Sequence, residues 1–318
     1  MNDNHPGSTR ARGGQWKDHV TRALRTAPGL ELLHEITPVA GGRSHLSWRV
    51  HCELGDILVK MPIRTPDWEY VNRHVVMHLH AQQAGVAVPP LLRVLQTPAG
   101  FPLLVFGWIH GRDGQQRWPE LTPLQQQQVA HKWGREVARA HQITGDAFTG
   151  HAPGVPWEQV VAAELNAILM AHRTTEILPT TVMAAAVDQI RRTVVGLGEI
   201  VRPAWTHRDL HLANIVVTET GGFAGLLDCE HARWWDPVAD AIKLGMWVGE
   251  HHPETEKAFW AGYFSFSLPL HQIRRRRRVC AGLEWLSGLA YWHRVGDYAM
   301  LENYRSRLIS WLGHTIAS

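Results

Sequence analysis

The sequence predicts an α+β protein of two lobes, with an antiparallel sheet in the N-terminal lobe and mostly helices in the C-terminal lobe. The length of 318 residues favours two lobes, because chains of this size commonly exceed what one core can hold. Apolar residues alternate as in strands in the first third of the chain, whereas helical periodicity dominates the remainder. We assign residues 16–109 to the N-terminal lobe and residues 110–318 to the C-terminal lobe, and we expect the polar residues 1–15 to be a disordered tail.

The N-terminal lobe is expected to begin with a short amphipathic helix and connector over residues 16–34, followed by four strands and one longer helix. Two β-like runs occupy residues 44–52 and 56–62 and are joined by a turn. Apolar residues at helical spacing predict a helix over residues 66–84, which ends before a glycine and a pair of prolines. Further strands are predicted over residues 91–96 and 101–109, which gives the order strand, strand, helix, strand, strand.

The C-terminal lobe is expected to be helical, with one β-hairpin as its main interruption. The hairpin strands, residues 215–218 and 223–228, flank a turn that contains two glycines. Helices are predicted over residues 123–142, 157–172, 180–200, 237–250, 254–266 and 270–313, the last with breaks.

Composition and charge exclude several classes of protein. Apolar residues make up 45% of the chain and charged residues 19%, which is too apolar for a disordered protein. The net charge of +3 is too small to indicate a nucleic-acid or membrane partner, and the oligomeric state stays open. The three cysteines are far apart, and neither a signal peptide nor a membrane span is predicted. We therefore expect a protein of the reducing cytoplasm.

The densest chemical signal surrounds the predicted hairpin. Asp209 lies on the loop before it, Asn214 immediately precedes its first strand, and Asp228 ends its second strand. If the hairpin is centred on Gly221, Asn214 and Asp228 are equidistant from the centre and meet at its open end. An amide oxygen and a carboxylate suit Mg²⁺, and Asp209 can accept a proton from an attacking hydroxyl. A base and two metal ligands are the parts that phosphoryl transfer requires.

Two other interpretations of these residues stay open. Each of them taken singly fits a structural role, with Asp209 capping a turn and the other two closing the hairpin. His207 and His211 have a spacing that binds zinc when both lie on one helix, but here they precede a strand. The joint spacing of Asp209, Asn214 and Asp228 favours the catalytic interpretation.

These motifs resemble those of the aminoglycoside phosphotransferase and choline kinase family, which is related to the protein kinases. The resemblance rests on H-x-D-x-x-x-x-N at His207, Asp209 and Asn214, on Asp228 in LLDCE, and on Asp236-Pro237-x-x-Asp240. It covers about residues 36–300 and implies a two-lobed protein-kinase-like fold. It also implies ATP and Mg²⁺ as cofactors and transfer of the γ-phosphate to a hydroxyl group of a small molecule. An antibiotic, a choline-like or thiamine-like amino alcohol and a sugar are all open as acceptors, and an antibiotic acceptor would imply antibiotic resistance.

The resemblance assigns roles in both lobes. It makes Asp209 the catalytic base, with His207 in the same catalytic loop, and it makes Asn214 and Asp228 the Mg²⁺ ligands. Asp240 is implied to brace the loop. The residues that it assigns to the nucleotide are Gly41, Gly42, Ser44, Lys60, Phe106 and Trp108. The glycines and the serine match a phosphate-covering loop, the lysine contacts the α- and β-phosphates, and the last two lie in the hinge whose backbone can bind adenine.

One position departs from the family pattern. The helix after Lys60 should supply a glutamate that pairs with this lysine, but His74 stands at that position. The nearest acid, Glu69, lies five residues earlier, which is about 140° around a helix. We therefore expect Lys60 to be held in another way.

Three further features concern the acceptor. The 15 tryptophans either fill a helical core or include a wall that stacks on a ring or cation. Acidic residues of the C-terminal helices either are solvated or attract a polyamine; they are Glu250, Glu254, Glu256 and Glu284. The consecutive arginines 274–278 cannot share one helix face, so they either pair with acids and solvent or capture an anion.

Two alternative functions are retained. A protein kinase is the first, because His207-Arg208-Asp209 matches the His-Arg-Asp motif of protein kinases. Against it, Asp228 is followed by Cys-Glu instead of Phe-Gly, and we find no Ala-Pro-Glu that would end an activation segment. A nucleotide-binding pseudokinase is the non-catalytic alternative, motivated by His74 in place of the glutamate.

Overall fold

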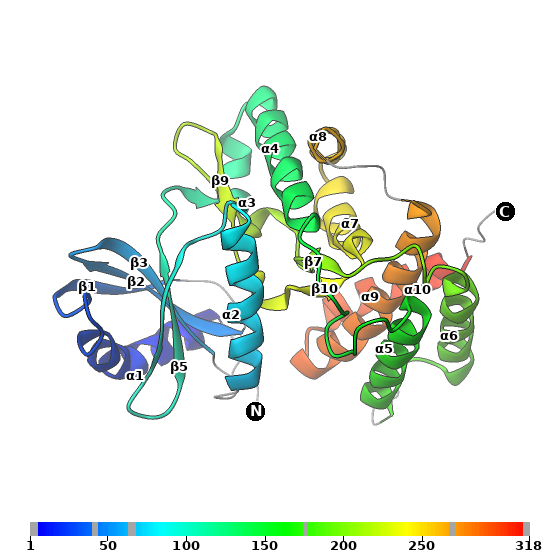
Figure 1. Cartoon of the computed structure of the whole chain (residues 1–318), viewed down its shortest axis with the longest axis horizontal. Coiled ribbons are helices and arrows are strands. Elements are labelled where there is room, and N and C mark those ends of the chain that lie inside the picture. Colours follow the sequence, from blue (N-terminus) through cyan, green and yellow to red (C-terminus); the bar gives the residue numbers. More distant parts are fainter. Residues whose placement is uncertain (1–5, 40–43, 63–67, 174–176, 267–270, 314–318) are drawn as a thin grey trace. The chain divides into compact units, whose positions relative to one another are not determined.

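The computed structural model describes residues 6–39, 44–62, 68–173, 177–266 and 271–313, with side chains from residue 16 onward. The chain divides into two units, one formed by residues 1–120 with 215–230 and the other by residues 121–214 with 231–318. Each unit has its own hydrophobic core. The return of residues 215–230 to the first unit makes that unit discontinuous in sequence (Figure 1).

The first unit contains a five-stranded sheet in which all neighbouring strands are antiparallel. Its order is β1 (Leu33–Val39), β2 (His45–Cys52), β3 (Gly55–Pro62), β5 (Pro102–Gly107) and β4 (Leu91–Gln96). The predicted antiparallel sheet is confirmed, and all four predicted strands are present. Strand β1 was not predicted, because it is an edge strand in which only Ile36 is buried, so it lacks alternating apolar residues.

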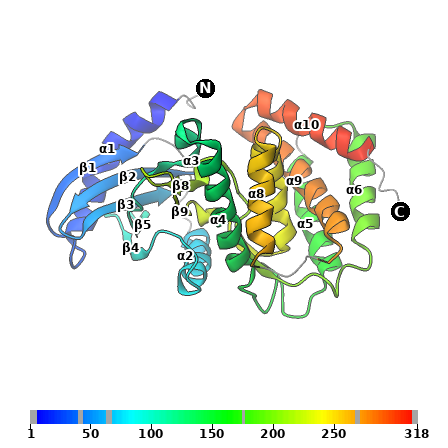
Figure 2. The ribbon, with the colours of Figure 1, turned by 90° about the horizontal axis from the view of Figure 1, so that it is seen from above.

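Two helices cover the opposite faces of this sheet (Figures 1 and 2). Helix α1 (Pro6–Arg25) packs Val20 and Leu24 against the face that carries Trp48 and Val59. Helix α2 (Trp68–Gln83) packs against the other face, which carries residues 58, 104 and 106. Because strand side chains alternate between faces, Lys60 lies on the same side as Leu58, facing α2.

Helix α1 begins at Pro6, within the segment that the sequence predicts to be a disordered tail. Packing explains the difference, because Val20, Ala23 and Leu24 are buried on the sheet and can nucleate a helix that polar residues then extend. Residues 16–25 of α1 agree with the amphipathic helix predicted from residue 16, whereas residues 6–15 are polar and carry no periodic signal. The predicted lobe boundary at residues 109 and 110 stays a prediction.

The predicted hairpin is present in a small sheet of order β6-β8-β9, formed by β6 (Arg112–Asp113), β8 (Ile215–Val217) and β9 (Phe223–Leu226). Its register differs from the predicted one. Ile215 pairs with Leu226, and Val217 pairs with Phe223, so the pairing is shifted and one extra residue lies in β9. A tight turn, in which the amide of Thr218 donates to the carbonyl of Gly222 at 2.8 Å, produces this bulge. Helix α3 (Gly114–Arg117) follows β6.

The second unit is mostly helical, as predicted. Its helices are α4 (Pro123–His141), α5 (Trp157–His172), α6 (Thr180–Val194), α7 (Asp240–Leu244), α8 (Pro253–Phe264), α9 (Ile273–Val295) and α10 (Tyr298–Gly313). The last two are separated at Gly296, whose φ of 77° suits glycine. A short antiparallel pair, β7 (Ala204–Thr206) and β10 (Arg233–Trp235), was not predicted, because three-residue strands carry little periodicity.

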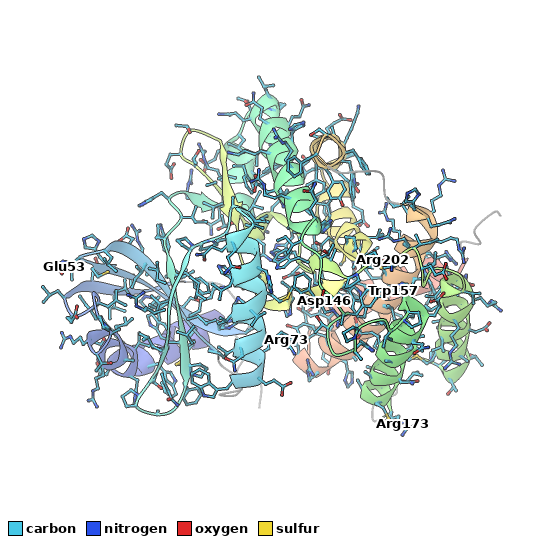
Figure 3. The ribbon with its side chains drawn as sticks, viewed as in Figure 1. Glu53, Arg73, Asp146, Trp157, Arg173 and Arg202 are labelled. Atoms are coloured by element: carbon cyan, nitrogen blue, oxygen red, sulfur yellow. The ribbon has the colours of Figure 1, made fainter. Side chains whose placement is uncertain are left out.

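Tryptophans fill much of the core of the second unit. Trp157 is fully buried (Figure 3) and packs edge to face on Trp235, with ring centroids 4.8 Å apart. Trp285 is buried in the same core, and Trp247 and Trp292 pack against it. These five tryptophans therefore agree with the core interpretation.

Within the described residues, no helix combines the length and apolar character needed to cross a bilayer. Cys52, Cys229 and Cys280 are buried free thiols.

Candidate active site

The segment that follows β7 adopts a conformation that non-glycine residues rarely take. Arg208 has φ of 72°, in the left-handed region. The carboxylate of Asp240, which begins α7, accepts the amide of His207 at 2.9 Å and the amide of Arg208 at 2.6 Å. Its Oδ2 also lies 2.9 Å from Nε2 of His141. These contacts agree with the bracing role implied for Asp240.

Asp240 is a buried anion held by this network. Burial raises the pKa of its carboxyl, but the hydrogen bond from His141 and the neighbouring positive charge and amides outweigh burial and lower the pKa. The carboxylate is therefore ionised at neutral pH and keeps its hydrogen bonds to the amides of His207 and Arg208.

Asp209 follows Arg208 and has three polar neighbours. Nζ of Lys243 lies 2.8 Å from its Oδ1, Nε2 of His211 lies 3.5 Å from its Oδ2, and the amide nitrogen of Asn214 donates to its Oδ2 at 3.2 Å. Burial raises the pKa of Asp209, but the charge of Lys243 and the contacts with His211 more than offset burial and place the pKa well below its ordinary value. Asp209 is thus ionised and partly exposed, at 21% of its side chain.

Asn214 is oriented by the same loop. Its Nδ2 donates to the carbonyl of Asp209 at 2.8 Å as well as to the carboxylate. Both bonds use the nitrogen, so Oδ1 points away from Asp209, and it accepts no hydrogen bond from the described residues. His207 is fully buried, and its Nδ1 accepts the amide of Asp209 at 3.3 Å. His207 therefore supports the loop from inside.

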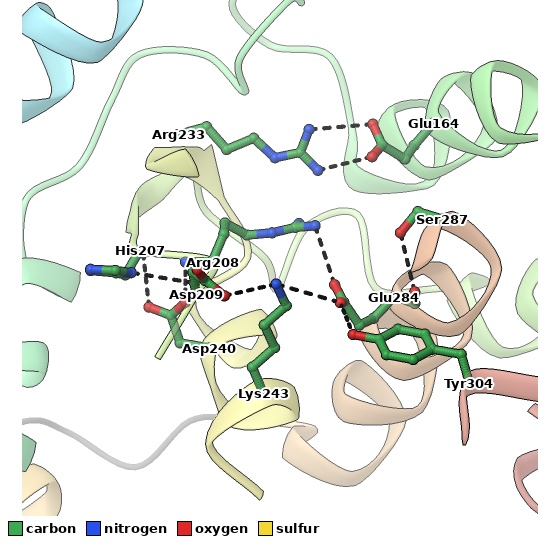
Figure 4. A network of polar contacts seen from close by, with 10 residues as sticks. All are labelled: Glu164, His207, Arg208, Asp209, Arg233, Asp240, Lys243, Glu284, Ser287 and Tyr304. Carbon is green, nitrogen blue, oxygen red and sulfur yellow. Dashed lines mark hydrogen bonds and ion pairs between the residues drawn. The ribbon is translucent and has the colours of Figure 1, made fainter. Parts of the chain in front are cut away.

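A charged network extends from Asp209 toward α9 and α10 (Figure 4). Lys243 also lies 3.9 Å from Glu284, which accepts the hydroxyl of Tyr304 at 3.2 Å. Arg208 lies 3.9 Å from the other oxygen of Glu284. Burial lowers the pKa of Lys243, but the charges of Glu284 and Asp209 raise it overall, so Lys243 stays protonated.

In the first unit, Lys60 and Asp228 form an ion pair. Nζ of Lys60 lies 2.8 Å from Oδ1 of Asp228. Burial lowers the pKa of Lys60, but the charge of Asp228 outweighs burial and raises the pKa overall. Asp228 also has a left-handed φ, of 60°, a conformation that aspartate adopts more readily than most residues with a β-carbon.

Sequence reasoning missed Glu230, two residues after Asp228. Its Oε2 lies 2.6 Å from Nδ1 of His45 and accepts the hydroxyl of Tyr70 at 3.0 Å. Its charge also helps to raise the pKa of Lys60. His74, which stands where a glutamate was expected, is buried, and burial together with Lys60 lowers its pKa well below the ordinary value. The Asp-x-Glu spacing was the available signal for an alternative acid near Lys60.

The remaining nucleotide candidates differ in what the structure says of them. Gly41 and Gly42 lie outside the described residues, and Ser44 directly precedes β2. Phe106 is buried against α2. The amide of Trp108 donates to the carbonyl of Asp56 at 3.2 Å, so this amide is already engaged within the unit.

The predicted site residues thus form two groups, each within one unit. Lys60 and Asp228 are in contact, and so are Asp209 and Asn214. The meeting of the two groups in one site stays a prediction.

Comparison with solved structures shows the fold. The chain is similar to the apo form of a thermostable mutant of aminoglycoside phosphotransferase APH(4)-Ia, with a TM-score of 0.65 and 16% identity over 90% of this chain and 96% of that one. It is also similar to aminoglycoside 2'-phosphotransferase-IIIa in its GDP complex, with a TM-score of 0.65 and 14% identity over 93% and 98%. A ternary complex of APH(4)-Ia with ADP and hygromycin B gives a TM-score of 0.66 at 16% identity over 90% and 96%. The predicted kinase-like fold is therefore confirmed.

The family is shown by a separate match. The model of the phosphotransferase enzyme family matches residues 35–280, which is more than half of the chain. The chain therefore belongs to this family, as the catalytic-loop motifs indicated. No curated protein matches the chain.

Proposed function

We propose that this protein transfers the γ-phosphate of ATP to a hydroxyl group of a small molecule, with Asp209 as the base. The observation that carries the proposal is the environment of Asp209, an ionised, partly exposed carboxylate. Lys243 and Asn214 fix its position, and Asp240 clamps the loop on which it lies. A carboxylate so fixed can orient an attacking hydroxyl, which is the main catalytic task in phosphoryl transfer.

The proposed reaction transfers one phosphoryl group to the acceptor and one proton away from it. The hydroxyl oxygen of the acceptor forms a bond to the γ-phosphorus, and the bond between this phosphorus and the β,γ-bridging oxygen breaks, so that ADP leaves. Asp209 accepts the hydroxyl proton as the new bond forms and releases it to water. Because the pKa of Asp209 is low, it is a weak base, and its contribution lies mainly in orientation before transfer.

Mg²⁺ fits the oxygen atoms that these residues offer. The Oδ1 of Asn214 and the Oδ2 of Asp228 accept no hydrogen bond within the described parts of their own units, and both are hard oxygen donors. When bound, Mg²⁺ would neutralise the charge of the β- and γ-phosphates. Lys60, protonated and beside Asp228, is suited to hold the α- and β-phosphates.

The base assignment is tested by Asp209→Asn and Asp209→Ala. We expect kcat for ADP release, measured over a panel of alcohols, to fall about 10²-fold or more while the thermal midpoint of unfolding changes little. Asp146→Asn is the matched control, because Asp146 is an exposed aspartate of the same unit (Figure 3). Turnover near the wild-type value in Asp209→Asn would refute the role. Phosphate transferred to protein would favour a protein kinase, and no acceptor at all a pseudokinase.

The metal assignment is tested by Asp228→Ala. Without this carboxylate, we expect calorimetric binding of a non-hydrolysable ATP analogue to lose its dependence on Mg²⁺. Asp56→Ala, in the same unit, serves as the control, because Asp56 pairs with Arg49 and His51 at the far end of β3. Unchanged Mg²⁺ dependence in Asp228→Ala would count against its role as a ligand.

A further inference from the structure

The carboxylates beside the proposed base are engaged by resident cations. Glu164 accepts two hydrogen bonds from Arg233, at 3.0 and 3.4 Å. Glu284 pairs with Lys243 and accepts the hydroxyl of Tyr304. A cationic acceptor would have to displace these partners, so the surroundings of Asp209 are poorly suited to an ammonium group.

The acidic residues considered as polyamine contacts also have polar partners. Glu250 accepts from Arg307 at 2.5 and 2.7 Å, Glu254 lies 3.7 Å from Lys257, and Glu256 accepts from Trp260 at 3.2 Å. Together with Glu284, all four therefore have partners among the described residues, and those of Glu250 and Glu284 are cations.

Arg208 differs from the other cations of this network. Within the described residues its guanidinium makes no hydrogen bond; its contacts are the 3.9 Å ion pair with Glu284 and the ring of Trp235, 5.5 Å from its centroid. A guanidinium carries five N–H donors in a planar fork. Its side chain is 16% exposed, so these donors can reach a ligand beside Asp209.

Arg233 lies on the same tryptophan. Its guanidinium carbon is 3.7 Å from the centroid of the Trp235 ring. The guanidinium groups of Arg208 and Arg233 therefore both contact the Trp235 ring. Burial and the charge of Arg208 lower the pKa of Arg233 to about 10 despite Glu164. The two guanidiniums therefore repel each other, and an oxyanion bound to Arg208 would reduce this repulsion.

The backbone of Arg208 strengthens the case for a ligand. Its left-handed φ of 72° costs a residue with a β-carbon about 1–2 kcal/mol, whereas glycine takes it freely. Strain of this kind is typical of functional positions. Asp240 holds this backbone in place through the amides of His207 and Arg208, so the position of the Arg208 side chain is fixed from its backbone.

We infer that Arg208 binds an oxyanion group of the acceptor, so that the acceptor is an alcohol carrying a carboxylate or a phosphate. The inference rests on the proposed kinase function and narrows its acceptor class. Guanidinium edges match the two oxygens of such a group. Lys243 lies 2.8 Å from Asp209 and 3.9 Å from Glu284, and Arg208 lies 3.9 Å from Glu284, so an anion held by Arg208 keeps a hydroxyl of the same small molecule near the base.

Four alcohols with one three-carbon frame test this. Glycerate and glycerol 3-phosphate carry the oxyanion, glycerol is neutral, and 3-amino-1,2-propanediol is cationic. ADP release from ATP is measured with each, on wild type, Arg208→Gln and the exposed-arginine control Arg274→Gln. We expect turnover with one or both oxyanion alcohols, and in Arg208→Gln a KM raised about tenfold or more, with kcat less affected. The control should match wild type.

A binding measurement makes the result independent of turnover. The Nε–Hε signal of Arg208, identified by its absence in Arg208→Lys, is followed by NMR with each compound at millimolar concentration in the presence of a non-hydrolysable ATP analogue. We expect glycerate and glycerol 3-phosphate to shift it, and glycerol and aminopropanediol to leave it in place. Which of the two anions gives the larger shift distinguishes a carboxylate from a phosphate site.

The outcomes separate this inference from the proposed function. Turnover only with neutral or cationic alcohols, unchanged in Arg208→Gln, would overturn the inference and support the kinase function. No turnover with any compound would leave the kinase function unsupported, and the NMR signal would then decide: a shift by the anions supports the oxyanion site, and no shift overturns it.

Discussion

Single residues in this protein adopt backbone conformations that residues with a β-carbon rarely take. Among the described residues, three non-glycine positions have positive φ, and two of them, Arg208 and Asp228, belong to the candidate site. Left-handed backbone costs such residues about 1–2 kcal/mol each. At Arg208 the two amide bonds to Asp240 offset this cost. Two of the three unfavourable backbone conformations therefore occur at charged residues of the candidate site.

The arginine run at the start of α9 shows how different consecutive residues can be. Arg276 is buried and donates to both oxygens of Asp236, at 3.0 and 2.5 Å. Arg278 is buried on the ring of Trp311, and Arg275 donates to the carbonyl of Thr193. Arg274 is exposed. Pairing and packing thus account for three of the five arginines.

This contrast predicts that Arg276→Met and Arg274→Met differ strongly in stability. Arg276→Met leaves the buried carboxylate of Asp236 without its cation, which should lower the free energy of unfolding by about 3–5 kcal/mol. Arg274 lies two residues earlier and is exposed to solvent. Arg274→Met should therefore change the free energy of unfolding by about 0.5 kcal/mol or less. Urea unfolding followed by fluorescence measures both. Equal losses in the two variants would contradict the assignment of Arg276 as a buried ion-pair partner.

At the scale of an element, helix α2 differs from a simple amphipathic helix, because two histidines face the sheet. His74 and His78 are both buried, with ring centroids 6.1 Å apart, and His78 lies 4.9 Å from Phe106. Burial is the main cause that lowers the pKa of each, and Lys60 adds to it. Both are therefore neutral in the folded protein near neutral pH.

This burial predicts that acid destabilises the first unit below pH 6.5. The unfolded chain takes up protons at these histidines near their ordinary pKa of 6.5, whereas the folded chain resists protonation. Stability is therefore fully present above that pH and is lost as the pH falls, by at most about 1.4 kcal/mol per pH unit for each histidine. Urea unfolding in half-unit steps from about pH 7 to about pH 5 measures the slope.

A variant identifies the source of this slope. His74→Leu removes one titrating group and should reduce the slope by about half, whatever its effect on absolute stability. His110→Gln, in an exposed residue of the same unit, should keep the wild-type slope. If the slope in His74→Leu equals that of wild type, the histidine is not the group that acid charges.

Elements with a strong periodic pattern were predicted well, and those defined by tertiary packing were not. The four strands of residues 44–109 and the helices α4, α5 and α8 were found within a few residues of their predicted bounds. Strand β1 and the pair β7 and β10 were missed, because edge position and short length remove the alternation on which prediction rests. Helix α1 was missed in part, because only its C-terminal half has an apolar face.

Site residues that belong to a sequence motif were also predicted, whereas those brought in by tertiary packing were not. The motif residues Asp209, Asn214 and Asp228 could be named from spacing, and the contacts of Asp209 with Asn214 agree with a shared role. Lys243, Glu284 and Glu230 could not, because they come from other segments and reach their partners only through tertiary packing. The predicted hairpin register also failed, since the bulge in β9 depends on turn hydrogen bonds that sequence symmetry does not reveal.

At the scale of the whole molecule, the chain leaves the first unit at residue 120 and returns to it for residues 215–230. The returning segment buries Phe223 and Leu226, and the amide of Leu226 donates to the carbonyl of Ala87 at 2.7 Å. It also brings Asp228 to Lys60 and Glu230 to His45. The first unit is therefore incomplete without a segment that is synthesised about 100 residues later.

We therefore predict that residues 1–120 alone do not fold cooperatively, and that a peptide of residues 215–230 added in trans restores folding. Without the peptide, the backbone partners in β6 and at Ala87 and the charge of Lys60 are unsatisfied, and each such buried group costs about 1–3 kcal/mol. Dispersion of the amide NMR spectrum and a cooperative thermal transition, measured with and without peptide, test this. The same peptide with Leu226→Asp is the control and should fail to restore either signal, because a charge would enter a fully buried position. A cooperative transition of the fragment alone, unchanged by the peptide, would mean that the sheet with α1 and α2 suffices, and that the hairpin serves the site without holding the unit together.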